Sequence, residues 1–348
     1  MLDSPLPLPL LTADLAGIGG RIKVELDDFE VEEIPAYAPS GQGEFLYLWV
    51  EKRDLGADYF QRQLAQRLGI ASGEIGTAGL KDRRAVTRQW VSVPALAEAR
   101  LAQLEGDGIR VLQVSRHTNK LRPGHLHGNR FRILIRDADP AAAERLPGLL
   151  DRVREQGLPN FYGAQRFGKD DETFHLGLTL LRGARPERRL SPFLRKLALS
   201  AVQSALFNDY LGRRLSDGLF RRVLPGDVMA KYPFGGMFVA TDVPAEQERF
   251  DRREIVSAGP IFGRKTFPAQ ADAAAREAGT LTRSGLSAAS FAGFGKLLQG
   301  TRRHNLVYLD DLAAEPTAHG IRLTFTLPAG SYATVLLREV MKNDVVAE

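Results

Sequence analysis

The sequence of 348 residues predicts a mixed α+β fold, and three observations support this prediction. Strand-like and helix-like segments alternate irregularly, without the regular strand–helix–strand rhythm of a doubly wound sheet. Beyond Pro159 much of the sequence is interrupted by Gly, Pro and Arg, and after His319 the earlier succession of strand-like and helix-like segments returns. This return indicates a discontinuous first domain, with about one domain's length of chain inserted in its middle.

Two kinds of apolar pattern predict the individual elements. Period-2 alternation or a continuous apolar run predicts strands, and apolar residues at helical spacing predict helices. The predicted strands are Arg21–Leu26, Phe29–Ile34, Glu44–Lys52, Gln89–Val93, Arg110–Ser115, Arg130–Arg136 and Ile321–Leu327. The predicted helices are Asp58–Leu68, Pro140–Gln156, Ser191–Leu215 and a last helix from Ser331.

The composition excludes several classes of chemistry. The chain has no cysteine, which rules out disulfides, iron–sulfur clusters and thiol nucleophiles. Its six histidines have no metal-binding spacing, and its glycine clusters lack the third glycine of a dinucleotide loop. No apolar run reaches the ~20 residues that a membrane span needs, and Met1–Leu11 lacks the basic start of a secretory signal. We expect a soluble, cytoplasmic protein that uses no cofactor, metal or membrane.

The net charge of +5 hides two basic stretches. Gly79–Arg136 contains 12 basic and 4 acidic residues, and Arg182–Arg222 contains 10 basic and 3 acidic residues. The rest of the chain therefore carries a charge of −10. Such a distribution fits a polyanionic partner, although solvated faces in an arginine-rich chain would produce the same charge pattern.

Asp82 is a candidate for chemistry that needs no cofactor. It stands in a Lys-Asp-Arg-Arg run, which in most proteins is a solvated loop. Neighbouring cations also keep a carboxylate ionised beside a polyanionic ligand, where it can act as a nucleophile or a base. From the residues alone both interpretations remain open.

Five segments, taken in order, resemble the TruD family of tRNA pseudouridine synthases, over nearly the whole chain. They are Lys23 with Asp28–Glu32, Ala78–Gln89, Gly128–Phe131, Asn160–Gly168 and Leu327–Thr334. The resemblance implies a pseudouridine synthase domain built on a mixed, largely antiparallel sheet, into which a second α+β domain is inserted. It implies domain boundaries at 1–158, 159–305 and 306–348.

The resemblance also implies roles for individual residues. Asp82 would be the catalytic aspartate, and Lys23 would hold its carboxylate ionised. Phe29, Phe131 and Tyr332 would offer aromatic faces to a uridine flipped out of its stack, and Asn129 would bond the uracil edge. Many family members carry Phe where Tyr332 stands, so the detail of that contact stays open. Without the family, Lys23 would be an exposed strand-edge residue and the aromatic rings would be ordinary core.

Two further positions have weaker interpretations. Glu32 either orders the active-site loop or pairs with an arginine. The segment Asn160–Gly168 is either a structural hinge or a direct RNA contact, since its glycines suit a tight backbone and its aromatics suit packing.

The function implied is the isomerisation of uridine 13 of tRNA to pseudouridine, by an isomerase that works as a monomer with tRNA as its partner. Direct attack of the aspartate on C1′ and a base-assisted glycal route both fit the sequence. A non-catalytic RNA-binding or RNA-chaperone protein on the same fold is the main alternative, and a carboxylate-dependent nucleoside hydrolase is a third.

Overall fold

A nine-stranded mixed sheet is the largest element of the computed structural model, which describes residues 3–184, 186 and 189–343. Its main strands follow the order β14-β15-β7-β2-β5-β3-β6, with β1 paired to β7 and β4 paired to β5. Only the β2–β5 pair is parallel among the strand pairs described in this sheet. The strands are β1 (Gly19–Arg21), β2 (Phe29–Pro35), β3 (Phe45–Arg53), β4 (Gly76–Thr77), β5 (Val86–Pro94), β6 (Ile109–His117), β7 (Leu126–Ala138), β14 (Ala313–Thr317) and β15 (Gly320–Pro328).

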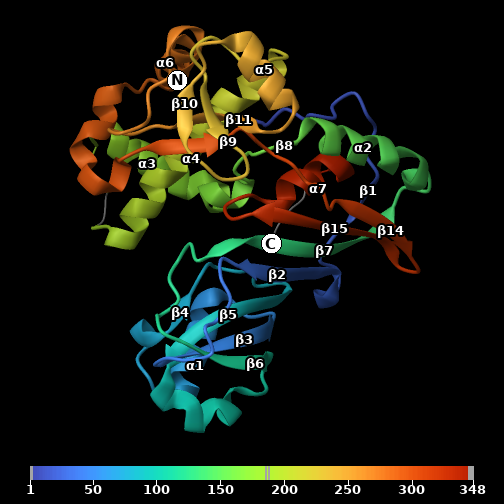
Figure 1. Ribbon diagram of the computed structural model, residues 1–348, viewed down its shortest axis with the longest axis vertical. Coiled ribbons are helices and arrows are strands. Elements are labelled where there is room, and N and C mark those ends of the chain that lie inside the picture. The colour runs from blue at the N-terminus through green and yellow to red at the C-terminus, as the bar shows by residue number, and fades with distance from the viewer. Residues whose placement is uncertain (1–2, 185, 187–188, 344–348) are drawn as a thin grey trace.

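Helices cover one face of this sheet in two separate places. Helix α1 (Ala57–Leu68) packs on the β3–β5 half, and α2 (Ala142–Gln156) and α7 (Ala333–Met341) pack on the β2–β7–β15 half. Figure 1 shows α2 and α7 together above β15, with α1 beside β3 and β6 at the other end of the molecule. Each helix is amphipathic, and its apolar stripe is the part that meets the sheet.

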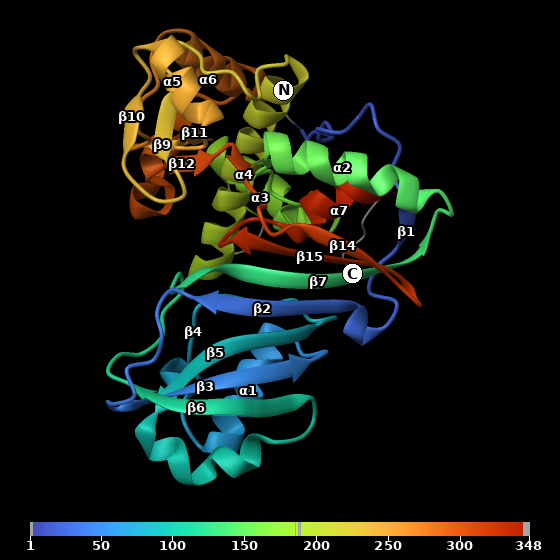
Figure 2. The same ribbon diagram turned by 45° about the vertical axis from the view of Figure 1, so that its right-hand side comes forward.

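The remaining elements form a second α+β unit. Its four-stranded sheet has the order β10-β9-β11-β12, and the long helix α4 lies beneath it (Figure 2). The strands are β9 (Val228–Lys231), β10 (Met237–Val239), β11 (Ile255–Ile261) and β12 (Thr301–His304). The helices are α3 (Glu172–Leu181), α4 (Pro192–Ser216), α5 (Val243–Asp251) and α6 (Ala271–Ser284). The chain enters this unit through β8 (Leu158–Pro159) and leaves through β13 (Leu306–Val307), which pair with each other antiparallel.

The predicted α+β class is confirmed, and most predicted elements are present within two residues of their expected ends. The strand expected at Arg21–Leu26 is wrong: β1 ends at Arg21, and a 3-10 turn follows at Leu26–Asp28. The cause is local, because Lys23 adopts a left-handed backbone (φ +56°) and the Glu25 N–H is bonded by the Asp28 carboxylate at 2.7 Å. Apart from α4, the elements of the second unit were not predicted, because these segments are short and their Gly and Pro residues interrupt the apolar periodicity.

A strip of polar side chains interrupts the covered face of the main sheet. Cross-strand register places Val31 beside both Phe131 and Thr87, and Thr87 beside Lys52, so all of these share one face. The polar strip lies between the apolar cluster under α1 and the cluster under α2 and α7. It consists of Glu33, Lys52, Thr87, Gln89 and Asn129. Burying polar groups costs free energy, so a strip of them across a core face indicates a functional surface.

Part of the second basic stretch is structural. Arg214 of α4 is fully buried and binds Asp227 with two nitrogens, at 2.8 and 2.5 Å. It also donates to the Tyr210 hydroxyl at 3.1 Å and to the Leu219 carbonyl at 3.1 Å. This guanidinium holds the end of α4 to the following loop and is not available to RNA.

We expect Arg214→Met to lower the free energy of unfolding by about 3–5 kcal/mol, because it leaves the buried Asp227 carboxylate without its cation. The neighbouring Arg213 is the control: it is half exposed, and its Asp209 partner also binds Arg283. Arg213→Met should cost less than about 1 kcal/mol. Urea unfolding of both variants checks this, and equal losses would contradict it.

Candidate functional site

Asp82 lies on the loop between β4 and β5, where it passes over the polar strip. Its side chain is 34% exposed, and its Oδ1 is 3.8 Å from the Nζ of Lys23, which is 7% exposed. The same ammonium lies 4.3 Å from the centroid of the Phe29 ring. Lys23 has a left-handed backbone, and its side chain lies at this position. The same backbone conformation ends β1, which is why the strand expected at Arg21–Leu26 does not form.

Two buried lysines hold this loop in place, one by bonding Asp82 and the other at the preceding residue of the loop. Lys52 donates to the carbonyl of Asp82 at 2.8 Å and to that of Leu55 at 2.6 Å. Lys81 forms a buried ion pair with Glu33 at 2.7 Å, and the backbone N–H of Trp90 donates to the same carboxylate at 3.3 Å. The loop is therefore bonded to β3 and β2, while the Asp82 carboxylate stays partly exposed beside Lys23.

Burial dominates the electrostatics of Lys52. It lowers the pKa of Lys52 to about 8, although the negative charge of Asp82 opposes the shift. Lys52 is still mainly protonated at neutral pH, and its hydrogen bonds hold the main chain of the loop.

Phe29, Phe131 and Asn129 come together on neighbouring strands. Phe131 lies opposite Val31, two residues from Phe29, and Asn129 lies opposite Glu33. The rings of Phe29 and Phe131 meet edge to face at 6.3 Å. Both rings are buried, so sequence patterning was right to give them a core role beside any functional one.

Two polar atoms of the strip have no partner within the described part of the chain. They are the Oδ1 of Asn129 and the Oγ1 of Thr87, both inaccessible to solvent. Such atoms are rare in folded proteins, because each unmade hydrogen bond costs about 1–3 kcal/mol. An unpaired acceptor at Asn129 is suited to a donor supplied by a ligand.

Tyr332 is the residue immediately before α7, beside the strand that carries Asn129. The turn leading to it is fixed to β7 by the bond from the Ala329 N–H to the His127 carbonyl, at 3.0 Å. The Tyr332 ring lies 5.9 Å from that of Tyr162, and burial raises the pKa of its hydroxyl. Among the described contacts none joins Tyr332 directly to Asp82, Lys23 or the two Phe rings.

Glu32 does not join the site. It lies on the opposite face of β2, where it pairs with Arg130 at 3.9 Å. The neighbouring Glu33 faces the strip instead and anchors Lys81, next to Asp82. Residues 29, 31 and 33 share one face of a strand, so the period-2 pattern that put Phe29 on the buried face also put Glu33 there. The inward position of Glu33 could therefore have been predicted from the sequence.

The segment Asn160–Gly168 joins the two units. The Arg303 guanidinium donates to the Asn160 carbonyl at 2.9 Å and to the Gly330 carbonyl at 2.8 Å, and it lies over the Tyr162 ring at 4.1 Å. The Ser331 hydroxyl bonds Asn160 at 2.9 Å. This network ties the turn before Tyr332 to the inserted unit, so the segment has a structural role.

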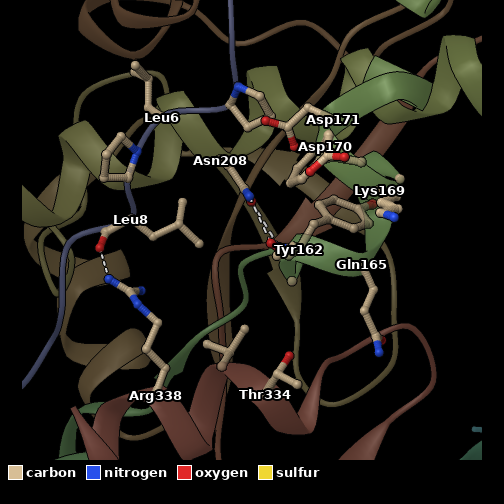
Figure 3. Close-up of a pocket in the computed structure, with 17 residues that line it drawn as sticks. Leu6, Leu8, Tyr162, Gln165, Lys169, Asp170, Asp171, Asn208, Thr334 and Arg338 are labelled. Atoms are coloured by element: carbon tan, nitrogen blue, oxygen red, sulfur yellow. Dashed lines mark hydrogen bonds between the residues drawn. The ribbon is translucent and has the colours of Figure 1, made fainter. Parts of the chain in front are cut away.

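A cavity of about 830 Å³ lies behind this junction. Figure 3 shows Tyr162 and Asn208 bonded to each other on its wall, with Thr334 and Arg338 of α7 below them. Asp170 and Asp171 at its edge both have left-handed backbones, with φ of 50° and 59°. None of the seven site residues predicted from the sequence lines it.

The described residues give two further results. Over residues 3–184, 186 and 189–343, no helix is both long and apolar enough to cross a bilayer. Within the same ranges, no group of three or more His, Asp or Glu side chains is placed to hold a metal ion.

Comparisons with known proteins agree with the geometry. A family model described as tRNA pseudouridine synthase D (TruD) matches residues 6–188 and 184–340. A tRNA pseudouridine synthase D of Thermus thermophilus is 46% identical over 97% of this chain and 93% of its own length. That of Anaeromyxobacter sp. strain Fw109-5 is 44% identical over 96% of both chains.

A solved structure is similar in fold. The putative tRNA pseudouridine synthase D from Methanosarcina mazei superimposes with a TM-score of 0.79 over 97% of each chain, at 24% identity. With the family model and the relatives covering nearly all of the chain, the protein belongs to the TruD family of tRNA pseudouridine synthases.

Proposed function

We propose that the chain converts uridine to pseudouridine in tRNA, with Asp82 as the catalytic aspartate. The observation that carries this proposal is the Asp82 carboxylate, which is partly exposed and lies beside the buried Lys23 ammonium on a loop bonded to β2 and β3. The Lys23 ammonium, 3.8 Å from Oδ1, is an opposite charge that attracts and orients the Asp82 side chain, and an aspartate carboxylate can act as a nucleophile or as a base.

The isomerisation exchanges bonds within one nucleotide. The N1–C1′ bond breaks, uracil turns, and C5 bonds to C1′. C5 loses its proton and N1 ends protonated, so no co-reactant is consumed. Asp82 can act either by attacking C1′ or as the base of a glycal route, and its exposed carboxylate is compatible with both.

The uracil would lie over the polar strip after leaving its stack. Unstacking costs a few kcal/mol, and a base–aromatic contact returns about 1–3 kcal/mol. Phe29 and Phe131 would form the apolar wall of this pocket, and Tyr332 would approach from the start of α7. Asn129 is partly exposed, and its unpaired Oδ1 would accept the N3–H of uracil after a rotation of the side chain that uncovers it.

The finer assignments follow the family. We propose uridine 13 as the target, a monomeric enzyme and a cytoplasmic location, where tRNA is the substrate. We propose domain boundaries at 158/159 and 305/306, because β8 and β13 bring these two points together. The inserted unit would form the second wall around the RNA, through exposed cations such as Arg195 and Lys196 on α4.

Asp82→Asn should lower isomerisation at least about 1000-fold while tRNA affinity falls less than about tenfold, since phosphates are held mainly elsewhere. Pseudouridine mapping of unmodified tRNA transcripts and a binding titration measure the two effects. Asp54→Asn, an exposed aspartate that pairs with Arg83 of the same loop at 3.6 Å, is the control and should retain activity.

Normal turnover by Asp82→Asn would sink the catalytic assignment, as would loss of binding in step with activity. Normal tRNA binding without pseudouridine in the unmodified chain would favour the non-catalytic alternative. Release of free uracil would identify a hydrolase.

The proposed docking on phosphates predicts a steep salt dependence. Neutralising several phosphates releases condensed counterions, so log Kd against log salt should rise with a slope of several units between about 50 and 200 mM salt. A flat dependence would contradict docking through phosphates.

Lys52→Met should remove the pH dependence that burial of Lys52 imposes on stability. Between pH 8 and its ordinary value of 10.5, folded Lys52 has lost a proton that the unfolded chain still holds. The wild-type free energy of unfolding should therefore rise relative to the variant through this window, by up to ~1.4 kcal/mol per pH unit. Urea unfolding at several pH values measures the difference.

Lys196→Met, at an exposed lysine of α4, is the matched control for the unfolding measurements only, and its stability should follow that of the wild type at every pH. The Lys52 variant should also isomerise about tenfold more slowly, since the Asp82 carbonyl loses its donor. A constant stability difference from about pH 8 to 10 would refute the buried-lysine interpretation.

A further inference from the structure

The tip of the β9–β10 hairpin carries an exposed aromatic ring that touches the main sheet. Phe234 is 71% exposed, yet its ring centroid lies 5.6 Å from that of His127 on β7, with 35° between the ring planes. The contact thus joins the inserted unit to the strand that carries Asn129.

The hairpin holds Phe234 in place from its base. The Lys231 N–H bonds the Gly236 carbonyl at 3.2 Å, and the Tyr232 N–H bonds the Glu254 carbonyl at 2.9 Å. The Tyr232 hydroxyl accepts from the Tyr308 N–H at 3.2 Å. An added Cβ on Gly235 would lie 2.6 Å from the Cβ of Lys231, so the turn packs closely on Lys231 and leaves no room for a side chain at this position.

His127 occupies an irregularity in β7. The register between β2 and β7 shifts at Ile34/Pro35, so that Gly128 and Leu126 have partners in β2 and His127 has none. Such bulges re-aim a side chain, and here the ring meets the hairpin. His127 is about 7 Å along the strand from Asn129, and its carbonyl holds the turn that leads to Tyr332.

The chemistry at this tip matches a nucleotide. Two aromatic rings lie together at the rim of the proposed uracil pocket, and the ammonium of the nearby Lys231 has no ion-pair partner among the residues that the structure describes. Stacking on an aromatic face beside a free cation is how proteins hold unpaired bases and their phosphates.

We propose that Phe234, supported by His127, stacks on the base of a nucleotide that flanks the target uridine. The inference rests on the proposed function, since it needs RNA at Asn129. When uridine leaves its stack, a neighbouring base loses a stacking partner, and Phe234 would replace it.

The test compares Phe234 with Phe193, an equally exposed phenylalanine (72%) at the start of α4. Phe234→Ala and Phe234→Leu should each lower kcat/KM and tRNA affinity about tenfold, since neither side chain offers a ring. Phe234→Trp should stay within about threefold of the wild type, and Phe193→Ala within about twofold.

Transcripts with an abasic nucleotide on the 5′ or the 3′ side of the target identify the stacked base. On one of them Phe234→Ala and the wild type should bind equally, because the partner of the ring is missing. The salt dependence of binding should be the same for both proteins, since no phosphate contact is lost.

Equal behaviour of Phe234→Ala and Phe193→Ala would overturn the proposal. So would a Phe234→Ala loss that keeps its full size on both abasic transcripts, which would mean that the ring only positions the hairpin. Affinity is measured separately from turnover. If the wild type makes no pseudouridine, the proposed function is refuted, but the affinities of the variants still decide the role of Phe234.

Discussion

The position of Asp82 depends on buried cations beneath its loop. Lys81 reaches Glu33 on β2, and Lys52 on β3 reaches the carbonyl of Asp82 itself. Both ammonium groups lie inside the protein, where an unpaired charge would be very unfavourable, so each needs its partner as much as the loop needs the bond. The partly exposed Asp82 carboxylate therefore stands on a loop that is held by bonds from two strands.

The sheet around this loop keeps a strip of mostly buried polar side chains between two apolar clusters. Leu48 and Val50 pack under α1, and Phe131 and Phe325 stack at 5.2 Å under α7. Packing on both sides fixes the strands that carry the strip, so its unpaired atoms cannot turn away to find partners within the protein. Their cost in stability is retained because the surrounding cores hold them in place.

Much of the main sheet could be predicted from the sequence, because its strands alternate or are continuously apolar. Phe29–Ile34 is an example, and the same alternation implied the inward position of Glu33. Other features were out of reach. Nothing local reveals that Lys23 adopts a left-handed backbone, that Arg214 is buried against Asp227, or that Phe234 meets His127, which is far away in the chain. These depend on tertiary contacts, which residue periodicity does not record.

The antiparallel pairing of β8 with β13 places the exit and the return of the chain side by side, with Pro159 opposite Leu306. The inserted unit therefore begins and ends at neighbouring points of the fold, as a hairpin loop does. Because the entropy of closing a loop grows only with the logarithm of its length, segments added to or removed from that unit away from the core that it shares with the main sheet would change the closure entropy little. The outer surface of the inserted unit can therefore change without moving the strands next to the Asp82 loop.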